Sequence, residues 1–406
     1  MFKTTYRKEE CVVENVGKVK NRKMMTLAIL FISALEMGGM GLQPALASIQ
    51  ASFPDAPATL IQTMSNFPGF AMLIGCLIST LLATKVSKKV LCQIGVGCYA
   101  AIAFLGFFFH GSILQLYAWQ IVLGLGFGLL MPTSNGIIAE NYDESQRGAI
   151  MGIQNTFTNG GGIYLTFVGG MLAAINWHYT YLAYLFGLIP LVLGCIYLPK
   201  DKPAAKADKK SGGHLNISKK TWLYGGIIFV FITSYTVFGS NVSFIINDRN
   251  LGSSAMTGTA MSIFLVGGML AGPLFSPTER KLHDYTFCCA FLLLTVGFFI
   301  VYMASSLVMV FVGALVTGLS MGFAMPTALL GCTNCNTVES ATAGCAVAHM
   351  AGQIGTVLSA IIYTSAASVF SSASDFRFLF ASIACAVLCV LVAVAVTIVN
   401  RAGSKA

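Results

Sequence analysis

Long apolar runs recur along the whole chain, and short polar segments divide them. A helix needs roughly 20 apolar residues to cross a bilayer, so each run predicts a membrane-spanning helix. The runs predict twelve spans, with approximate limits 24–48, 60–83, 90–109, 113–139, 148–173, 178–198, 222–246, 255–276, 285–304, 306–331, 343–367 and 376–399. The expected fold class is therefore an all-α membrane protein with twelve transmembrane helices.

One polar break is longer than the others and divides the spans into two sets of six. Residues 200–221 are charged and contain proline and glycine, which is typical of a flexible linker. We expect one six-helix bundle over 24–199 and a second over 222–399, flanked by tails at 1–23 and 400–406. The first tail is polar and basic with no cleavable apolar segment, so the first span is expected to be retained.

The two sets of spans share a repeated motif. Residues 124–136 (GLGFGLLMPTSNG) align with residues 318–331 (GLSMGFAMPTALLG), and both contain Met-Pro-Thr, at Pro132 and Pro326. Internal repeats of this kind place a substrate site near the membrane midplane, between the halves. A proline inside a helix kinks it. The two prolines therefore predict kinks, which either gate the site or only shape the helices.

Charge sets the expected orientation. Of the 406 residues, 56% are hydrophobic and only 10% are charged, with a mean hydropathy of +0.77; a soluble domain carries about 25% charged residues. The net charge of +9 does not indicate nucleic acid, because the charges lie in loops and tails. All Lys and Arg except Arg249 and Arg377 fall on one predicted side. The positive-inside rule then predicts a multi-pass protein of the cell membrane with both termini in the cytoplasm.

The twelve cysteines do not predict a disulfide framework or a metal site. Most lie inside apolar runs, where cysteine behaves as a small hydrophobe. Cys332 and Cys335 form a single Cys-x-x-Cys, and a zinc site of this type needs a second pair. We expect no cofactor and no metal.

Several motifs resemble those of the major facilitator superfamily. The loop after the second span, residues 80–89, is similar to the family's Gly-x-Leu-Ala-Asp-Arg-x-Gly-Arg-Lys, with Lys85, Lys88 and Lys89 at basic positions and Thr84 in place of Asp. Gln120 stands where drug/proton antiporters often carry Arg, and residues 159–170 are similar to their glycine-rich fifth-span motif. The resemblance implies the superfamily's fold, two pseudo-symmetric six-helix bundles. It also implies an exporter related to bacterial drug/proton antiporters, with degenerate motifs.

Glu36 is the candidate for proton coupling, because no other acidic residue lies deep in a predicted span. Charged residues inside a membrane are costly and are usually kept for function. Burial disfavours the charged form of a carboxyl, so Glu36 can load and release a proton as access to its cavity changes. Alternatively it pairs with a cationic substrate, or it is a protonated carboxyl that only bonds a neighbouring helix.

Other polar residues in the spans are candidates to line a substrate site. No Lys or Arg lies in a predicted span core, which favours a neutral, cationic or amphipathic substrate. His349 could be a second titrating group. The alternative for these residues is hydrogen bonding between helices. The candidate substrate-binding residues are Glu36, Gln120, Asn155, Thr158, Asn159, Tyr235, Thr236, Asn241, His349 and Gln353.

The sequence thus predicts a secondary active transporter that moves a small organic compound by alternating access, coupled to protons and directed outward. Its expected partners are the substrate, protons and the lipid bilayer, and it is expected to be a monomer. Proton-coupled or facilitated uptake of a metabolite is the alternative within this class. An enzyme would need clustered catalytic groups at one membrane level. A receptor or scaffold would not need a deep carboxylate.

Overall fold

The computed structural model describes residues 22–82, 85–142, 144–198, 218–335, 338–370 and 373–403, and these are helical apart from turns and short connections. Most of the predicted linker and the first 21 residues lie outside the described part. The N-terminal group of helices comprises α2 (Arg22–Ser33), η1 (Gly38–Met40), η2 (Gln43–Ala45), α3 (Leu46–Ser52), α4 (Ala58–Leu82), α5 (Lys88–Phe108), α6 (Ile113–Asn141), α7 (Glu144–Ile175), η3 (Trp177–Gly187) and α8 (Leu188–Tyr197).

The C-terminal group follows after the linker. It comprises α9 (Lys219–Asp248), α10 (Ser254–Leu270), α11 (Gly272–Leu282), η5 (His283–Tyr285), α12 (Thr286–Tyr302), α13 (Leu307–Asn334), α14 (Val338–Ser359), η6 (Ala360–Thr364), α15 (Ser365–Ser368) and α16 (Ser374–Gly403). Within the described residues, 11 helical stretches are long and apolar enough to cross a membrane. They do not include α7, which has 32 residues but carries polar side chains and several glycines.

Four of the predicted spans are not single α-helices, and in the sixth predicted span the 3-10 helix η3 precedes α8. The first is broken between Ser33 and Leu46. The eighth is interrupted at Ala271, just before Gly272-Pro273, because proline cannot continue the hydrogen-bond ladder. The eleventh ends in a π-turn, η6, followed by α15. Hydropathy alone predicts the length of an apolar run and not its continuity, which is why these interruptions were not predicted.

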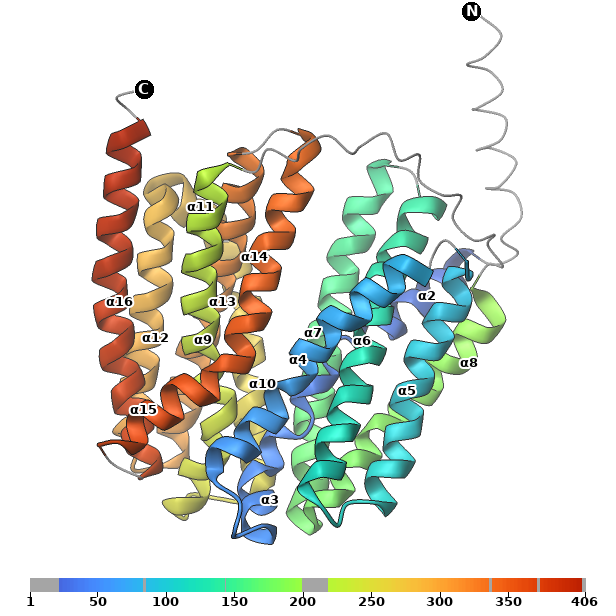
Figure 1. Ribbon diagram of the computed structural model, residues 1–406, viewed down its shortest axis with the longest axis horizontal. Helices are drawn as coiled ribbons and strands as arrows, with labels where there is room; N and C mark the ends of the chain where they lie inside the picture. Colours follow the sequence, from blue (N-terminus) through green and yellow to red (C-terminus); the bar gives the residue numbers. More distant parts are fainter. Residues whose placement is uncertain are drawn as a thin grey trace, which may run out of the picture.

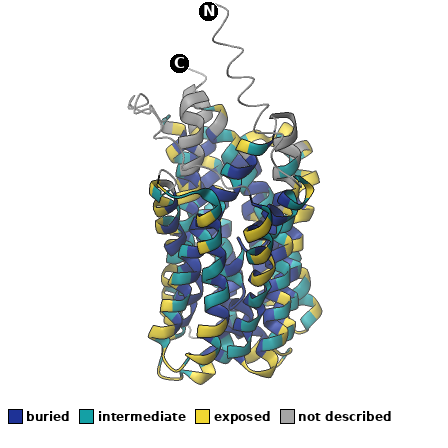
Figure 2. Cartoon of the chain, turned by 90° about the vertical axis from the view of Figure 1, so that its right-hand side faces the viewer, coloured by how far each residue is buried: buried dark blue, intermediate teal, exposed yellow. Residues whose placement is uncertain are grey.

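Each group has its own apolar core. One core is built from residues of α2 to α8 and reaches across only to Phe244, and the other is built from residues of α9 to α16. Exposed residues crowd the ends and outer faces of the helices (Figure 2). Many of them are large and apolar, including Leu81, Leu114 and Val308, as expected for surfaces that face lipid.

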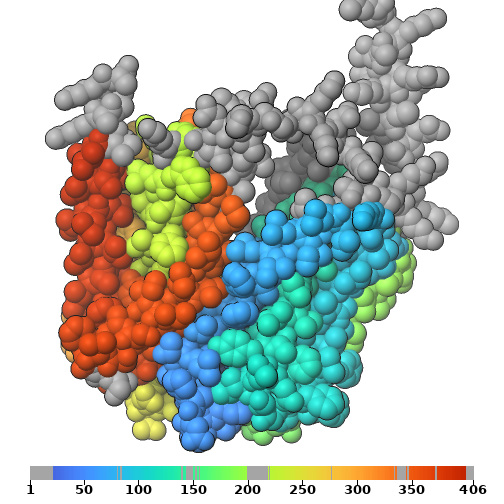
Figure 3. Space-filling model, viewed as in Figure 1, coloured from blue at the N-terminus to red at the C-terminus, as the bar shows by residue number. Residues whose placement is uncertain are grey.

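The two groups meet mainly at one end of the molecule. In Figure 1 the N-terminal group (blue to green) lies on the right and the C-terminal group (yellow to red) on the left. We call the end where α2 begins and α16 ends the terminal end, and the opposite end the far end. Hydrogen bonds between the groups join residues 44–66 and 163–166 to residues 240–262 and 364. Figure 3 shows α14 (orange) lying directly against α4 (blue).

Candidate functional site

The candidate site is built on the break in the first span. After α2 ends at Ser33, the chain runs through turns and two short 3-10 helices before α3 begins at Leu46. Gly38, Gly39, Gly41 and Pro44 lie in this stretch, and glycine and proline are the least favourable residues in a helix interior. The break therefore follows from the local sequence.

Two tyrosines from the same group hold the broken segment in place. The Tyr99 hydroxyl donates to the Leu35 carbonyl oxygen at 2.7 Å, and the Tyr184 hydroxyl donates to the Gly38 carbonyl oxygen at 2.7 Å. A carbonyl freed from a helix inside a membrane must find another partner. Gly38 and Gly41 let the rings approach, since a Cβ there would lie 2.8 Å from the Tyr99 oxygen and 2.6 Å from the Tyr184 oxygen, respectively.

Glu36 lies in this broken segment and is 8% exposed. Its Oε1 accepts a hydrogen bond from the Ser134 hydroxyl of α6 at 3.2 Å, and its Oε2 accepts one from the Thr158 hydroxyl of α7 at 3.3 Å. Behind them, Gln154 Nε2 donates to the Ser134 oxygen at 3.4 Å. The carboxyl is thus held by hydroxyl and amide groups from two neighbouring helices.

No cation neutralises this carboxyl within the described residues. The ion pairs found there are Lys88–Glu140, Arg249–Asp375 and Glu279–His283. The end of α2 adds partial negative charge, because the carbonyls of a helix point toward its C-terminus. Removing an unpaired charge from water is costly. The arrangement therefore favours a neutral, protonated carboxyl or a bound cation, and the buried Ser33 hydroxyl is a further polar group beside it.

The other predicted site residues of the N-terminal group differ in whether they contact Glu36. Thr158 contacts Glu36, as described above. Asn159, on the same helix, is partly buried, and the side chain of Asn155 lies outside the described residues. Gln120 of α6 is 0% exposed, and neither of its amide atoms has a hydrogen-bond partner among the described residues.

The candidates of the C-terminal group do not surround Glu36. Tyr235 stacks on Phe264 with a centroid distance of 4.6 Å, and Thr236 donates to the Ile232 carbonyl at 2.8 Å. His349 on α14 is exposed. The hydrogen-bond partners of Glu36 come from α6 and α7, so nothing in this arrangement joins His349 to the carboxyl.

The two remaining C-terminal candidates lie where the groups meet. The Gln353 side chain of α14 packs against Gly69 of α4, where an added Cβ would stand 2.7 Å from its Oε1. Asn241 of α9 is 1% exposed and bonds Gln62 of α4 at 2.9 Å. Both residues therefore contact the opposite group.

The prolines of the repeated motif lie inside long helices, and the lysines of the loop motif lie at a helix end. Pro132 and Pro326 are inside α6 and α13, and both helices continue past them. Lys88 pairs with Glu140 at the end of α6. Lys89 donates to the carbonyl oxygens of Cys195 at 2.7 Å and Leu198 at 2.9 Å, while Lys85 is exposed. Two of the three lysines therefore tie α5 to its neighbours within the N-terminal group.

Sequence reasoning missed some functional candidates and misplaced one. It placed no Lys or Arg in a span core, but Arg377 lies in α16 and is only 9% exposed. Arg377 is near the start of the span, and a charged residue at that position is usually interpreted as part of the adjoining loop. Ser134 was also missed, although it directly follows the repeated Met-Pro-Thr. No sequence pattern indicated a role for Gln62, because its hydrogen-bond partners are distant in sequence.

A family model described as Major Facilitator Superfamily matches residues 25–245, which is more than half of the chain. The chain belongs to the major facilitator superfamily. This match confirms the family expected from the sequence. It also confirms the expectation that the protein is a transporter rather than an enzyme.

Two curated relatives match part of this superfamily chain. It is 32% identical over 118 residues to the multidrug resistance protein B homolog of Mycobacterium tuberculosis, covering 28% of this chain and 22% of that protein. It is 26% identical over 193 residues to the hexuronate transporter of Bacillus subtilis, covering 42% of this chain and 44% of that protein. The chain therefore spans less than half the length of each relative in these matches.

Solved structures confirm the fold. The nucleoside transporter NupG matches with a TM-score of 0.75 and 13% identity, covering 91% of this chain and 98% of that one. A bacterial homolog of the human lysosomal transporter Spinster matches with a TM-score of 0.71 and 14% identity, covering 92% and 96%. The expected all-α membrane fold of the superfamily is therefore correct.

Proposed function

We propose that this protein is a secondary transporter that exports a small organic compound in exchange for protons. The observation that carries the proposal is the Glu36 carboxyl, which is buried at a break in the first span and is held by hydroxyls, with no ion pair to it among the described residues. Membership of the major facilitator superfamily supports transport as the activity. The chemistry of the pocket supports a proton as the coupling ion, because protonation removes the cost of the buried charge.

The proposed cycle follows from access to this carboxyl. Glu36 takes a proton when the pocket opens outward and releases it when the pocket opens to the cytoplasm, where substrate binds. A cationic or amphipathic substrate fits best, since it competes with the proton for the same carboxylate. The placement of Lys and Arg supports assigning the terminal end to the cytoplasm. The resemblance to the multidrug resistance protein B homolog supports outward transport.

Uptake of a metabolite is the second candidate, and one specific observation favours it. The match to the hexuronate transporter covers more of this chain than the match to the multidrug resistance protein homolog, 42% against 28%. A sugar acid would be carried inward together with a proton. The direction of the proton movement that a substrate elicits separates the two candidates.

The test is proton flux in proteoliposomes that contain a pH-sensitive dye. A cationic dye such as ethidium and a sugar acid such as glucuronate serve as the two probes. We expect ethidium to drive proton movement in the opposite direction to its own, and Glu36→Gln to reduce this flux to the level of empty liposomes. The matched control is Glu279→Gln, the same substitution at a carboxylate on α11, and it should leave the flux unchanged.

Three outcomes decide between the possibilities. Undiminished proton flux in Glu36→Gln protein that is folded would overturn the role of Glu36. Transport driven by a Na⁺ gradient with no pH change would replace the proton by another cation. Proton movement in the same direction as glucuronate, with none for ethidium, would establish the uptake candidate in place of export.

A further inference from the structure

At the far end, a chain of buried polar side chains joins the two groups of helices. Gln62 of α4 donates from Nε2 to Asn241 Oδ1 of α9 at 2.9 Å, and the Thr364 hydroxyl of η6 donates to Gln62 Oε1. One turn along, Asn66 Nδ2 donates to the Ser240 hydroxyl oxygen at 3.1 Å. We call these five residues the far-end latch.

The latch is closed off from water. Its members are at most 3% exposed, and none of them is charged. A buried amide is stabilised only while its hydrogen bonds are made. Separating α4 from α9 would break the bonds of Gln62 and Asn66 together, and these amides would then need water as their partner. The latch therefore stabilises the joined arrangement of the far end.

A buried arginine fixes one end of this chain of bonds. Arg377 of α16 donates from a terminal nitrogen to Asn241 Oδ1 at 3.1 Å, so this single oxygen accepts from both groups of helices. The guanidinium also lies 5.6 Å from the centroid of the Phe244 ring. Asp248 acts on it electrostatically, but no ion pair to Arg377 is found within the described residues.

The guanidinium and the Val237 carbonyl together determine the direction of the bonds that run from Asn241 through Gln62 to Thr364. A guanidinium has only N–H donors, so Asn241 must turn its oxygen toward it. The Asn241 nitrogen is then used by the Val237 carbonyl at 3.0 Å. Gln62 must therefore present its own nitrogen to Asn241, which leaves its oxygen for Thr364. The Val237 carbonyl only accepts and so favours the same orientation of Asn241, and removal of the guanidinium takes away one of the two donors to the Asn241 oxygen.

We propose that Arg377 is a positioning residue that acts through Asn241 to orient the far-end latch, and that it thereby sets how often the far end opens. The link to transport rests on the proposed alternating-access function. The effect on opening does not, because it depends only on the contacts described above. Removal of the guanidinium shifts the protein toward the arrangement in which the far end is parted and the terminal end is joined.

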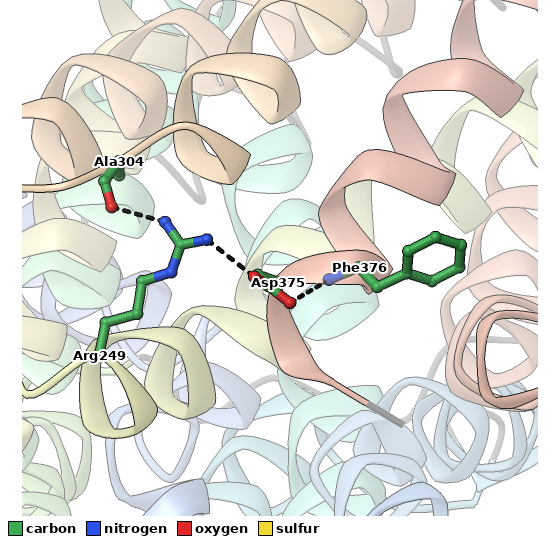
Figure 4. Close-up of polar contacts among 4 residues, drawn as sticks. All are labelled: Arg249, Ala304, Asp375 and Phe376. Carbon is green, nitrogen blue, oxygen red and sulfur yellow. Dashed lines mark hydrogen bonds and ion pairs between the residues drawn. The ribbon is translucent and has the colours of Figure 1, made fainter. Parts of the chain in front are cut away.

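The other far-end arginine provides a matched control. Arg249 donates to the Ala304 carbonyl at 2.6 Å and to Asp375 Oδ2 at 3.0 Å, while Asp375 Oδ1 accepts from the Phe376 backbone at 2.7 Å (Figure 4). All of these residues belong to the C-terminal group. Loss of Arg249 therefore alters contacts inside one group and leaves the latch intact.

Hydrogen–deuterium exchange of the full-length protein in lipid nanodiscs tests the proposal. In Arg377→Gln and in Gln62→Ala, we expect exchange of residues 58–66 and 236–246 to rise about fivefold, the change in an equilibrium constant expected from one lost buried hydrogen bond. Exchange at the terminal end of α6 and α9 should fall. Arg377→Lys, which keeps a donor-only cation, should restore most of the wild-type pattern, and Arg249→Gln should leave both ends unchanged.

Opening of the far end raises exchange there and lowers it at the terminal end, whereas loss of structure raises exchange at both ends. Unchanged exchange in Arg377→Gln would overturn the proposal. A rise at both ends would also overturn it, because it would make Arg377 a residue that only stabilises the fold. Exchange requires no substrate and no ion gradient, so failure here leaves proton coupling through Glu36 standing, and failure of the flux experiment leaves the latch standing.

Discussion

Gly161 lets α7 pack directly against the broken segment that carries Glu36. A Cβ at this position would run into the carbonyl oxygen of Ala34 and would lie 2.7 Å from the Ala34 Cα, both of which are backbone atoms. Backbone cannot rotate away as the tip of a side chain can. Thr158, three residues earlier on α7, reaches Glu36 from the same helix. The close approach at Gly161 therefore supports the position of the carboxyl.

Gly161→Ala is expected to destabilise the protein, and its neighbour provides the control. A Cβ at Gly160 meets nothing within 4 Å, so Gly160→Ala gains the helix propensity of alanine, about 1 kcal/mol, without a clash. Gly161→Ala gains the same propensity but must move backbone, at a cost of about 1–3 kcal/mol for overpacking. Thermal unfolding in detergent measures the difference. Equal melting temperatures of the two variants would contradict the packing described for Gly161.

At the scale of elements, the broken first span has some features that the sequence predicts and others that it does not. The order of the apolar runs and the deep carboxylate follow from local composition. Hydropathy does not reveal the break, because the apolar run continues through it, although the glycines and Pro44 within it disfavour a continuous helix. Its two tyrosine partners are 64 and 146 residues away from the carbonyls they bond, and only the folded arrangement of α5 and η3 brings them there. Hydrogen bonds between residues so distant in sequence produce no periodic pattern from which they could be predicted.

The broken span should depend on its two tyrosine hydroxyls. Tyr99→Phe and Tyr184→Phe each remove one of the two donors to a carbonyl oxygen, which keeps its backbone donor, a loss of about 0.5–1.5 kcal/mol. Tyr181→Phe is the matched control, because its hydroxyl is buried nearby in η3 and has no hydrogen-bond partner. Thermal unfolding should show lower melting temperatures for the first two variants and an unchanged or higher one for the third. A loss of stability in Tyr181→Phe as large as in Tyr99→Phe would show that the ring, and not the hydroxyl bond, is what matters.

At the scale of the whole molecule, the two groups of helices have separate apolar cores but are joined by polar contacts. Hydrophobic pattern therefore predicts each group and says little about their interface. The repeat alignment predicted candidates on the eleventh span, and the structure places Gln353 against α4 while His349 is exposed. Which face of a helix meets the opposite group depends on how the bundles dock, and that is set by residues such as Gln62 and Arg377.

Close helix contact supports the far-end latch at a second place. Where α7 crosses α10, a Cβ at Gly258 would meet the Thr166 carbonyl oxygen and would lie 3.0 Å from the Gly170 Cα. Beside this crossing, the hydroxyls of Thr166 and Ser262 are 3.1 Å apart. Both contacts join the N-terminal group to the C-terminal group, so this crossing exists only while the far end is joined.

Gly258→Ala is therefore expected to part the far end while leaving each group folded. The added methyl clashes only in the joined arrangement, and overpacking of about 1–3 kcal/mol shifts the equilibrium toward the parted one. Gly268→Ala on the same helix is the control, because its Cβ would meet only the Gly318 carbonyl at an ordinary 3.5 Å. Deuterium exchange of residues 58–66 should rise in Gly258→Ala and stay unchanged in Gly268→Ala. Gly258 has no side chain that could donate or accept a hydrogen bond. If exchange of residues 58–66 rises in both Gly258→Ala and Arg377→Gln, the rise is therefore due to separation of the two groups. Wild-type exchange in Gly258→Ala would mean that the crossing of α7 and α10 does not restrain the far end.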